Sequence, residues 1–225
     1  MGERKRFMQW YEEEVRGLEQ AREKSPPFCD PVAFYGSSSI RLWNTLAQDF
    51  AGERVVNLGF GGSTLEACAS FFERLVVPYS PRALVLYAGD NDIGDGKSPE
   101  AIEGYYQILS DKVRRYLGPI PFAFLSIKSS PARHHLIDSI VRTNALIRQE
   151  HLSRPGRIYV DVFSLMLNID GTPRAELYSE DGLHLNAAGY AVWRRALCAH
   201  HDELFGTELH AGKLEQHAPR VPQVV

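Results

Sequence analysis

Short apolar runs alternate with stretches of helical periodicity along most of the chain. An apolar run bounded by Gly or Pro is typical of a buried strand, whereas apolar residues three and four apart are typical of an amphipathic helix. Strands are predicted over residues 32–35, 54–59, 83–88, 122–127 and 158–163. Each run is nearly continuous in apolar residues, which predicts strands that are covered on both faces.

The segments between these runs predict helices. Residues 1–25 predict an amphipathic N-terminal helix, with one face formed by Phe7, Trp10, Tyr11, Val15 and Leu18. Further helices are predicted over residues 40–46, 65–76, 98–117, 137–147 and 190–204, where apolar residues recur at helical spacing. The C-terminal tail, residues 206–225, has little periodicity and predicts no element.

This alternation predicts an α/β fold. Near-continuous apolar strands separated by helices indicate a parallel sheet with helices on both faces, which is a three-layer α/β/α architecture. Right-handed crossovers bring the carboxyl ends of the strands to one edge. We expect a central five-stranded parallel sheet in the flavodoxin-like order 2-1-3-4-5. We also expect one domain over residues 1–225, because this length can bury one sizeable core.

Composition and charge narrow the function classes. Hydrophobic residues make up 44% of the chain and charged residues 24%, with a formal net charge of −3, as in ordinary globular proteins. Such a mixture predicts neither a nucleic-acid-binding surface nor a membrane span. The chain starts with charged residues, so no signal peptide is expected and the predicted location is cytoplasmic. The three cysteines are widely spaced, which argues against a disulfide framework or a zinc site.

Polar turns follow the first three predicted strands, and another is expected to open the last helix. They are Gly36-Ser37-Ser38, Gly61-Gly62, Gly89-Asp90-Asn91-Asp92 and Asp181-Gly182-Leu183-His184. In an open parallel sheet, ligands bind outside the carboxyl ends of the strands. Acyl transfer needs a hydroxyl nucleophile, an imidazole base, a carboxylate that orients the imidazole, and donors for an oxyanion. The turns contain all of these groups, and no metal or organic cofactor is implied.

Each motif alone also has an ordinary interpretation. The serines could cap the following helix, and His184 could be a surface histidine. The glycines at 59–62 suggest a phosphate-binding loop, but Thr64 stands where the dinucleotide pattern has its last Gly. The turn at Asp90 suggests a calcium loop, but Asp95 stands where an EF-hand has Gly. The combination of the four turns is therefore what favours catalysis.

In order and spacing, the four motifs resemble the SGNH (GDSL) esterase-lipase superfamily. Gly36-x-Ser38, Asn57 to Gly62, Gly89-x-Asn91-Asp92 and Asp181-x-x-His184 carry the resemblance, which extends from about residue 32 to the final helix. It implies a serine esterase in which Ser38 is the nucleophile, His184 the general base and Asp181 the carboxylate that orients His184. It also implies an oxyanion hole formed by the Ser38 N–H, the Gly62 N–H and the Asn91 amide.

One departure from the family pattern concerns the nucleophile. The family's Gly-Asp-Ser-Leu reads Gly36-Ser37-Ser38-Ser39 in this chain. The position of the Gly favours Ser38, and Ser37 and Ser39 are the alternatives. The missing Asp does not remove proton transfer, which the resemblance assigns to His184.

The expected activity is hydrolysis of carboxylic esters, and the absence of a large apolar lid favours short, acetyl-type acyl groups on a small-molecule substrate. A lysophospholipase or thioesterase is the alternative within the superfamily. A noncatalytic ligand-binding module is the alternative from another class, and it predicts that Ser38, Asp181 and His184 are not within hydrogen-bond reach. Residues 128–133 and 165–178 are expected to wall the pocket. The N-terminal helix and the tail are candidate surfaces for a homo-oligomer.

Overall fold

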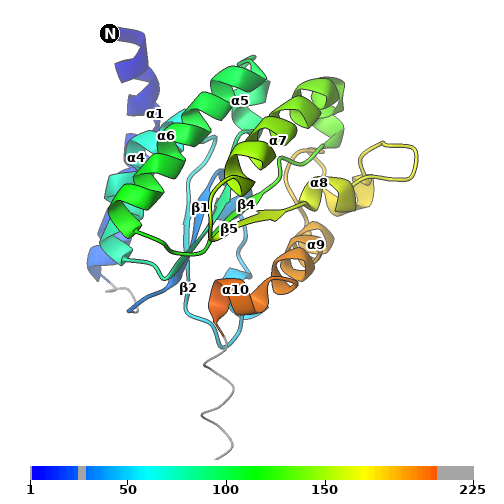
Figure 1. The fold of residues 1–225 in the computed structure, drawn as a ribbon. Coiled ribbons are helices and arrows are strands. Elements are labelled where there is room, and N and C mark those ends of the chain that lie inside the picture. Colours follow the sequence, from blue (N-terminus) through cyan, green and yellow to red (C-terminus); the bar gives the residue numbers. More distant parts are fainter. Residues whose placement is uncertain (1, 25–28, 207–225) are drawn as a thin grey trace, which may run out of the picture.

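One parallel sheet organises the computed structural model, which describes residues 2–24 and 29–206, with side chains from Met8 onward. Its order is β2-β1-β3-β4-β5, and helices lie on both sides of it (Figure 1). The strands are β1 (Val32–Gly36), β2 (Val55–Gly59), β3 (Ala83–Tyr87), β4 (Phe122–Leu125) and β5 (Arg157–Val160). The predicted fold class and strand order are thus confirmed.

The helices bury two separate hydrophobic cores against the two faces of the sheet. One face is covered by α1 (Gly2–Lys24), α4 (Leu65–Leu75), α6 (Pro99–Leu117) and α7 (Ile137–Leu152). The other is covered by α2 (Ser38–Arg41), α3 (Leu46–Asp49), α9 (Ala187–Cys198) and α10 (His201–Phe205). Successive side chains of β1 alternate between the two cores, since a strand has a period of two. Both faces are therefore apolar, as the near-continuous runs predict.

Short elements occupy the connections between the main helices and strands. They are η1 (Val77–Tyr79), α5 (Asp90–Gly94), η2 (Pro131–Leu136), α8 (Val162–Leu165) and η3 (Ala175–Leu177). The strand predicted over residues 158–163 ends at Val160, because the Asp161 carboxylate accepts the Ser164 N–H at 3.1 Å and caps α8. None of the helices within the described residues is long and apolar enough to cross a membrane.

The predictions for the first and the last helix of the chain are partly wrong. In α1, Tyr11 and Val15 are buried, but Trp10 is 80% exposed and does not belong to the packed face. The side chain of Phe7 and the tail from residue 207 onward lie outside the described residues. The helix predicted over residues 190–204 is broken between α9 and α10, where His200 has non-helical backbone angles.

The end of β1 approaches β3 closely at Gly36. Its φ of +137° is disfavoured for residues with a side chain, and a Cβ added there would lie 1.9 Å from the Tyr87 carbonyl oxygen. The next residue, Ser37, donates its N–H to the same oxygen at 2.9 Å. Only glycine therefore fits the position from which the chain turns into α2.

We expect Gly36→Ala to lower the free energy of unfolding by about 3 kcal/mol or more, because it combines steric overlap with backbone strain. Gly17→Ala is the matched control, because Gly17 lies in α1 with nothing within 4 Å of an added Cβ. It is expected to change stability by less than about 1 kcal/mol, in the stabilising direction. Urea denaturation of both variants measures this, and equal stabilities would contradict the close approach.

His151 is fully buried between α6, α7 and β5. Its Nε2 lies 3.1 Å from the Ile158 carbonyl oxygen, and its Nδ1 is hydrogen-bonded to the Tyr106 hydroxyl. Burial, aided by the positive charge of Arg157, lowers the pKa of His151 from 6.5 to about 4. The folded protein thus holds a neutral imidazole, which donates to the carbonyl and accepts from the hydroxyl.

This burial makes stability depend on pH in a defined window. Above pH 6.5, His151 is neutral in both the folded and the unfolded state. Between pH 6.5 and about 4, the unfolded state binds a proton at this residue and the folded state does not, so the free energy of unfolding falls as the pH falls. The loss attributable to His151 is about 3 kcal/mol. Chemical denaturation between pH 7.5 and 4 should show a shallower decline for His151→Gln than for the wild type. The exposed-site control His135→Gln should leave the wild-type slope unchanged, and an unchanged slope in His151→Gln would contradict the assignment.

Candidate active site

The turn after β1 presents one of its three serine hydroxyls. Ser37 is 2% and Ser39 3% exposed, whereas Ser38 is half-buried and its Oγ lies 3.0 Å from His184 Nε2. The helix that begins at Ser38, α2, is only four residues long. Its dipole is accordingly weaker than the longer predicted helix would supply. Of the three candidates, Ser38 is the hydroxyl that contacts the imidazole.

His184 and Asp181 are joined within one turn. His184 Nδ1 lies 2.6 Å from Asp181 Oδ2, and Asp181 Oδ1 accepts the backbone N–H groups of Leu183 and His184, both at 2.9 Å. The hydrogen bond with the His184 side chain is the main reason that the pKa of Asp181 falls to about 2. Asp181 is therefore a carboxylate at neutral pH, and it holds the imidazole with its Nδ1–H toward Asp181 and its Nε2 toward Ser38.

Antiparallel contacts, and not a helix start, position this turn. Tyr178 pairs with Leu185 in an isolated antiparallel bridge, and Ser179 N–H donates to the His184 carbonyl at 2.8 Å. The helix that follows begins later, because Asn186 caps α9 by accepting N–H groups with its side-chain oxygen. The expectation that residues 181–184 open the last helix is wrong, although the three-residue spacing does bring the carboxylate to the ring.

The groups predicted to hold an oxyanion lie in the two neighbouring turns. Gly62 has a φ of +65° and is exposed in the loop between β2 and α4. Asn91, in the first turn of α5, donates from Nδ2 to the Ser63 carbonyl at 3.1 Å, which places its amide beside that loop. Among the residues that the structure describes, no acceptor is found for the backbone N–H of Ser38 or of Gly62.

A close contact ties α2 to the end of β2. Asn57 Nδ2 donates to the Ile40 carbonyl at 2.7 Å, and Asn57 Oδ1 accepts the Gly59 N–H at 3.0 Å. A Cβ at Gly59 would lie 2.2 Å from the Arg41 nitrogen, so α2 rests directly on the strand. This part of the glycine-rich motif is therefore structural.

The N-terminal helix reaches the Gly61-Gly62 loop with two polar side chains that sequence reasoning missed. Tyr11 donates its hydroxyl to the Gly62 carbonyl at 3.1 Å, and Glu14 Oε2 accepts the Gly61 N–H at 2.5 Å. Tyr11 also packs edge-on against Phe60 in the core. The two peptide groups on either side of the one that carries the Gly62 N–H are thus held from the α1 side.

A buried charged cluster stands behind Asn91. Asp90 pairs with Lys128 at 3.0 Å and with Arg133 at 2.9 Å, and Lys128 is only 1% exposed. Burial alone would raise the pKa of Asp90, but the two cations outweigh it and lower that pKa. The expectation that residue 128 walls a pocket is wrong, because its side chain is in the interior.

The segment predicted to form the other wall is mixed in character. Met166 is fully buried, and its sulfur accepts the Trp193 indole N–H at 3.2 Å, so Met166 belongs to the core. Leu165 is 48% exposed, and Ile169 is fully exposed at the tip of the loop. Met166 is therefore part of the core, whereas Leu165 and Ile169 face solvent.

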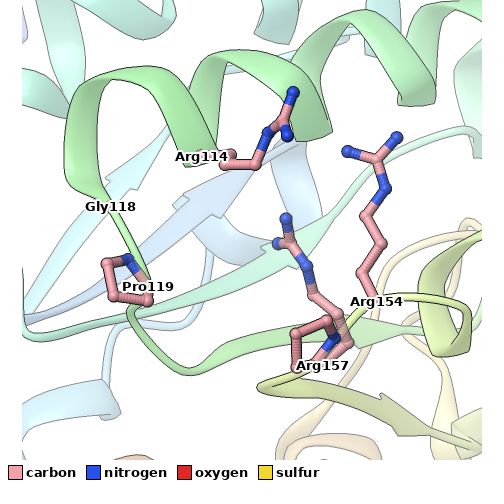
Figure 2. A pocket seen from close by; sticks show the side chains of 6 residues that line it. Arg114, Gly118, Pro119, Arg154 and Arg157 are labelled. Atoms are coloured by element: carbon pink, nitrogen blue, oxygen red, sulfur yellow. The ribbon is translucent and has the colours of Figure 1, made fainter.

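A second set of polar side chains lies at the opposite edge of the sheet, around a cavity of about 510 Å³ (Figure 2). Its lining includes Arg114, Arg154 and Arg157. Arg154 pairs with Asp111 at 2.8 Å and with Glu150 at 2.6 Å. Arg114 and Arg154 lie at the C-terminal ends of α6 and α7, where a cation is favoured by the helix dipole. Arg157 is the first residue of β5, and its guanidinium lies over the Phe122 ring. These interactions account for the cluster, which is remote from Ser38.

Several solved structures share the fold. A candidate platelet activating factor from Streptococcus pneumonia has a TM-score of 0.76 at 18% identity, over 87% of this chain and 95% of that chain. A GDSL-like lipase from Bacteroides thetaiotaomicron has a TM-score of 0.65 at 20% identity, over 85% and 95%. An acetyl xylan esterase has a TM-score of 0.64 at 19% identity, over 75% and 98%. The sequence itself has no significant match among curated proteins.

At these identities the structural likeness concerns the fold. The model of the GDSL-like Lipase/Acylhydrolase family, however, matches residues 29–192 directly. That range is most of the chain, and it contains the turns at Ser38, Gly62, Asn91 and His184. The chain therefore belongs to the GDSL-like Lipase/Acylhydrolase family.

Proposed function

We propose that this protein is a serine esterase that hydrolyses carboxylic esters through an acyl-enzyme on Ser38. The observation that carries the proposal is the continuous hydrogen-bond chain from Ser38 Oγ to His184, at 3.0 Å, and from His184 to Asp181, at 2.6 Å. These three residues come from opposite ends of the chain, and a structural role explains neither the serine hydroxyl nor the ring orientation. A noncatalytic module predicts the three groups apart, so the geometry argues against that alternative.

The reaction proceeds in two displacements. His184 Nε2 takes the Ser38 hydroxyl proton as Oγ attacks the ester carbonyl carbon, and Asp181 stabilises the resulting imidazolium. The tetrahedral intermediate collapses, the ester C–O bond breaks, and the leaving alcohol takes the proton from His184. A water molecule then attacks the acyl-enzyme with His184 again as base, which releases the carboxylic acid and restores Ser38.

The negative charge that develops on the carbonyl oxygen needs donors. Ser38 N–H, Gly62 N–H and the second Nδ2 hydrogen of Asn91 are the groups we assign to it. The two backbone groups are supported by the lack of an acceptor for them within the described residues. For Asn91, one amide hydrogen is engaged by Ser63 and the other is left for the substrate.

For the substrate we propose short, acetyl-type esters. A solved acetyl xylan esterase shares the fold, and in the segment expected to wall the pocket the large apolar side chains found exposed within the described residues are Leu165 and Ile169. A lysophospholipase or thioesterase would need a larger apolar surface for a long acyl chain. A comparison of the rates at which the acetate, octanoate and palmitate esters of 4-nitrophenol are hydrolysed separates these cases. We expect the acetate to be hydrolysed fastest, whereas faster hydrolysis of the palmitate would favour the alternatives.

The nucleophile assignment is tested by labelling with a fluorophosphonate probe. We expect one adduct in the wild type, on Ser38 by peptide mapping, and none in Ser38→Ala. Ser37→Ala is the matched control, since it removes a neighbouring hydroxyl that is 2% exposed, and it should still be labelled. An adduct on Ser37 or Ser39 would reassign the nucleophile, and no adduct on folded protein would contradict an esterase.

The oxyanion assignment predicts that Asn91→Ala lowers kcat for 4-nitrophenyl acetate about 10²–10³-fold, with a much smaller change in KM, because the lost donor acts in the transition state. Asn44→Ala, at an exposed asparagine, serves as the control and should retain wild-type kinetics. Steady-state kinetics measure both. An unchanged kcat in Asn91→Ala would exclude the amide from the oxyanion hole.

A further inference from the structure

The side-chain amide of Asn91 is held at both ends. Its Nδ2 donates to the Ser63 carbonyl at 3.1 Å, and its Oδ1 accepts from Arg133 Nη2, also at 3.1 Å. An Asn amide has two orientations that differ by a half-turn and exchange the donor and acceptor ends. A guanidinium carries donors and no acceptor, so it tolerates only the orientation with the oxygen toward it. Arg133 and the Ser63 carbonyl, which can only accept, thus require the same orientation of the Asn91 amide.

We propose that Arg133 is a positioning residue for the proposed esterase reaction and acts through Asn91. The inference rests on the proposed function, because it assigns Arg133 the task of keeping the Asn91 Nδ2 at the oxyanion. Arg133 itself does not contact the triad: its hydrogen-bond and ion-pair partners in the described residues are Asn91, Asp90 and Ser130. It supports a donor and is not a donor to the substrate.

Arg133 is itself fixed in place from three sides. Its Nη1 lies 2.9 Å from Asp90 Oδ1, and its backbone N–H donates to the Ser130 carbonyl at 3.0 Å. The guanidinium also rests on Gly94, where an added Cβ would lie 2.9 Å from the guanidinium carbon. A side chain with this many contacts loses little conformational entropy when it binds Asn91, so it can hold the amide in a single orientation.

The charge of the cluster adds an electrostatic effect. Lys128 and Arg133 are two cations on one carboxylate, Asp90, which leaves about one net positive charge in a largely buried position next to Asn91. A cation at the amide oxygen polarises the group and strengthens its N–H as a donor. The benefit is largest when the substrate oxygen carries negative charge, which is the transition state rather than the bound ester.

The same short segment also contacts the turn that carries the triad base. Ala132 N–H donates to the Gly182 carbonyl at 3.0 Å, and the neighbouring Pro131 lies against Gly182. Residues 130–133 therefore touch both halves of the site, with Asn91 on one side and the Asp181–His184 turn on the other. Arg133 is the only side chain of this segment that reaches the oxyanion half in the described structure.

The test is a double-mutant cycle on kcat for 4-nitrophenyl acetate, using Arg133→Met and Asn91→Ala. Arg133→Met leaves Asp90 paired with Lys128, so the buried carboxylate keeps a partner. We expect Arg133→Met to lower kcat about 10- to 100-fold with KM changed less than about twofold. In the Asn91→Ala background the same substitution should change kcat by less than about twofold, because the group it positions is gone.

Arg154→Met is the matched control. It likewise removes an arginine that is paired with carboxylates, in this case Asp111 and Glu150, but at the opposite edge of the sheet. We expect its kcat and KM to equal those of the wild type. Arg133→Lys keeps the charge and the pairing with Asp90, and it should fold as the wild type does and retain an intermediate kcat. Urea denaturation of each variant separates lost structure from lost positioning.

The outcomes distinguish this inference from the proposed function. If Ser38→Ala keeps its turnover, the esterase mechanism fails and the inference fails with it. If Ser38→Ala is inactive but Arg133→Met or Arg133→Lys has wild-type kcat, the mechanism stands and the positioning role is wrong. Fully additive losses in the double mutant would likewise overturn a role that acts through Asn91.

Discussion

The register of β1 against its two neighbours is the constraint on which the rest of the structure depends. Gly36 pairs with Gly59 of β2 on one side and with Tyr87 of β3 on the other. The turns that follow these strands therefore start at the same level of the sheet, and the polar groups they carry meet there. A slip of one residue would shift the Ser38 turn by about 3.3 Å and exchange the faces of every β1 side chain. The two cores and the site thus depend on the same pairing.

Much of this was predictable because it follows from local pattern and from the geometry of parallel sheets. Near-continuous apolar runs predict the strands, and right-handed crossovers then bring Ser38, Gly62 and Asn91 to one edge. Ser38 and His184 are 146 residues apart in the chain, and their contact follows from the strand order together with the family motif. The choice among three adjacent serines needed the structure, since burial and not spacing separates Ser38 from its neighbours.

What the sequence did not reveal is mostly interaction between distant polar residues. In the sequence, Lys128 and Arg133 belong to a segment that predicts a surface loop. They pair with Asp90 because α5 packs against that segment in the fold. Tyr11 and Glu14 sit on an ordinary amphipathic helix, where nothing local marks them as contacts of a glycine loop. The helical spacing predicts Trp10 on the packed face of α1, but its side chain is exposed, because Tyr11 and Val15 already fill the contact with the core. Pairwise polar contacts leave no periodic signal.

The position of α1 has a consequence for comparing relatives of this protein. The family model begins at residue 29, whereas Tyr11 and Glu14 lie before it and still hold the loop that carries Gly62. Two homologues identical over the shared segment can therefore differ in how rigidly that loop is held. For this architecture, residues outside the four motifs contact the loop that carries Gly62, and a classification by motif does not record them.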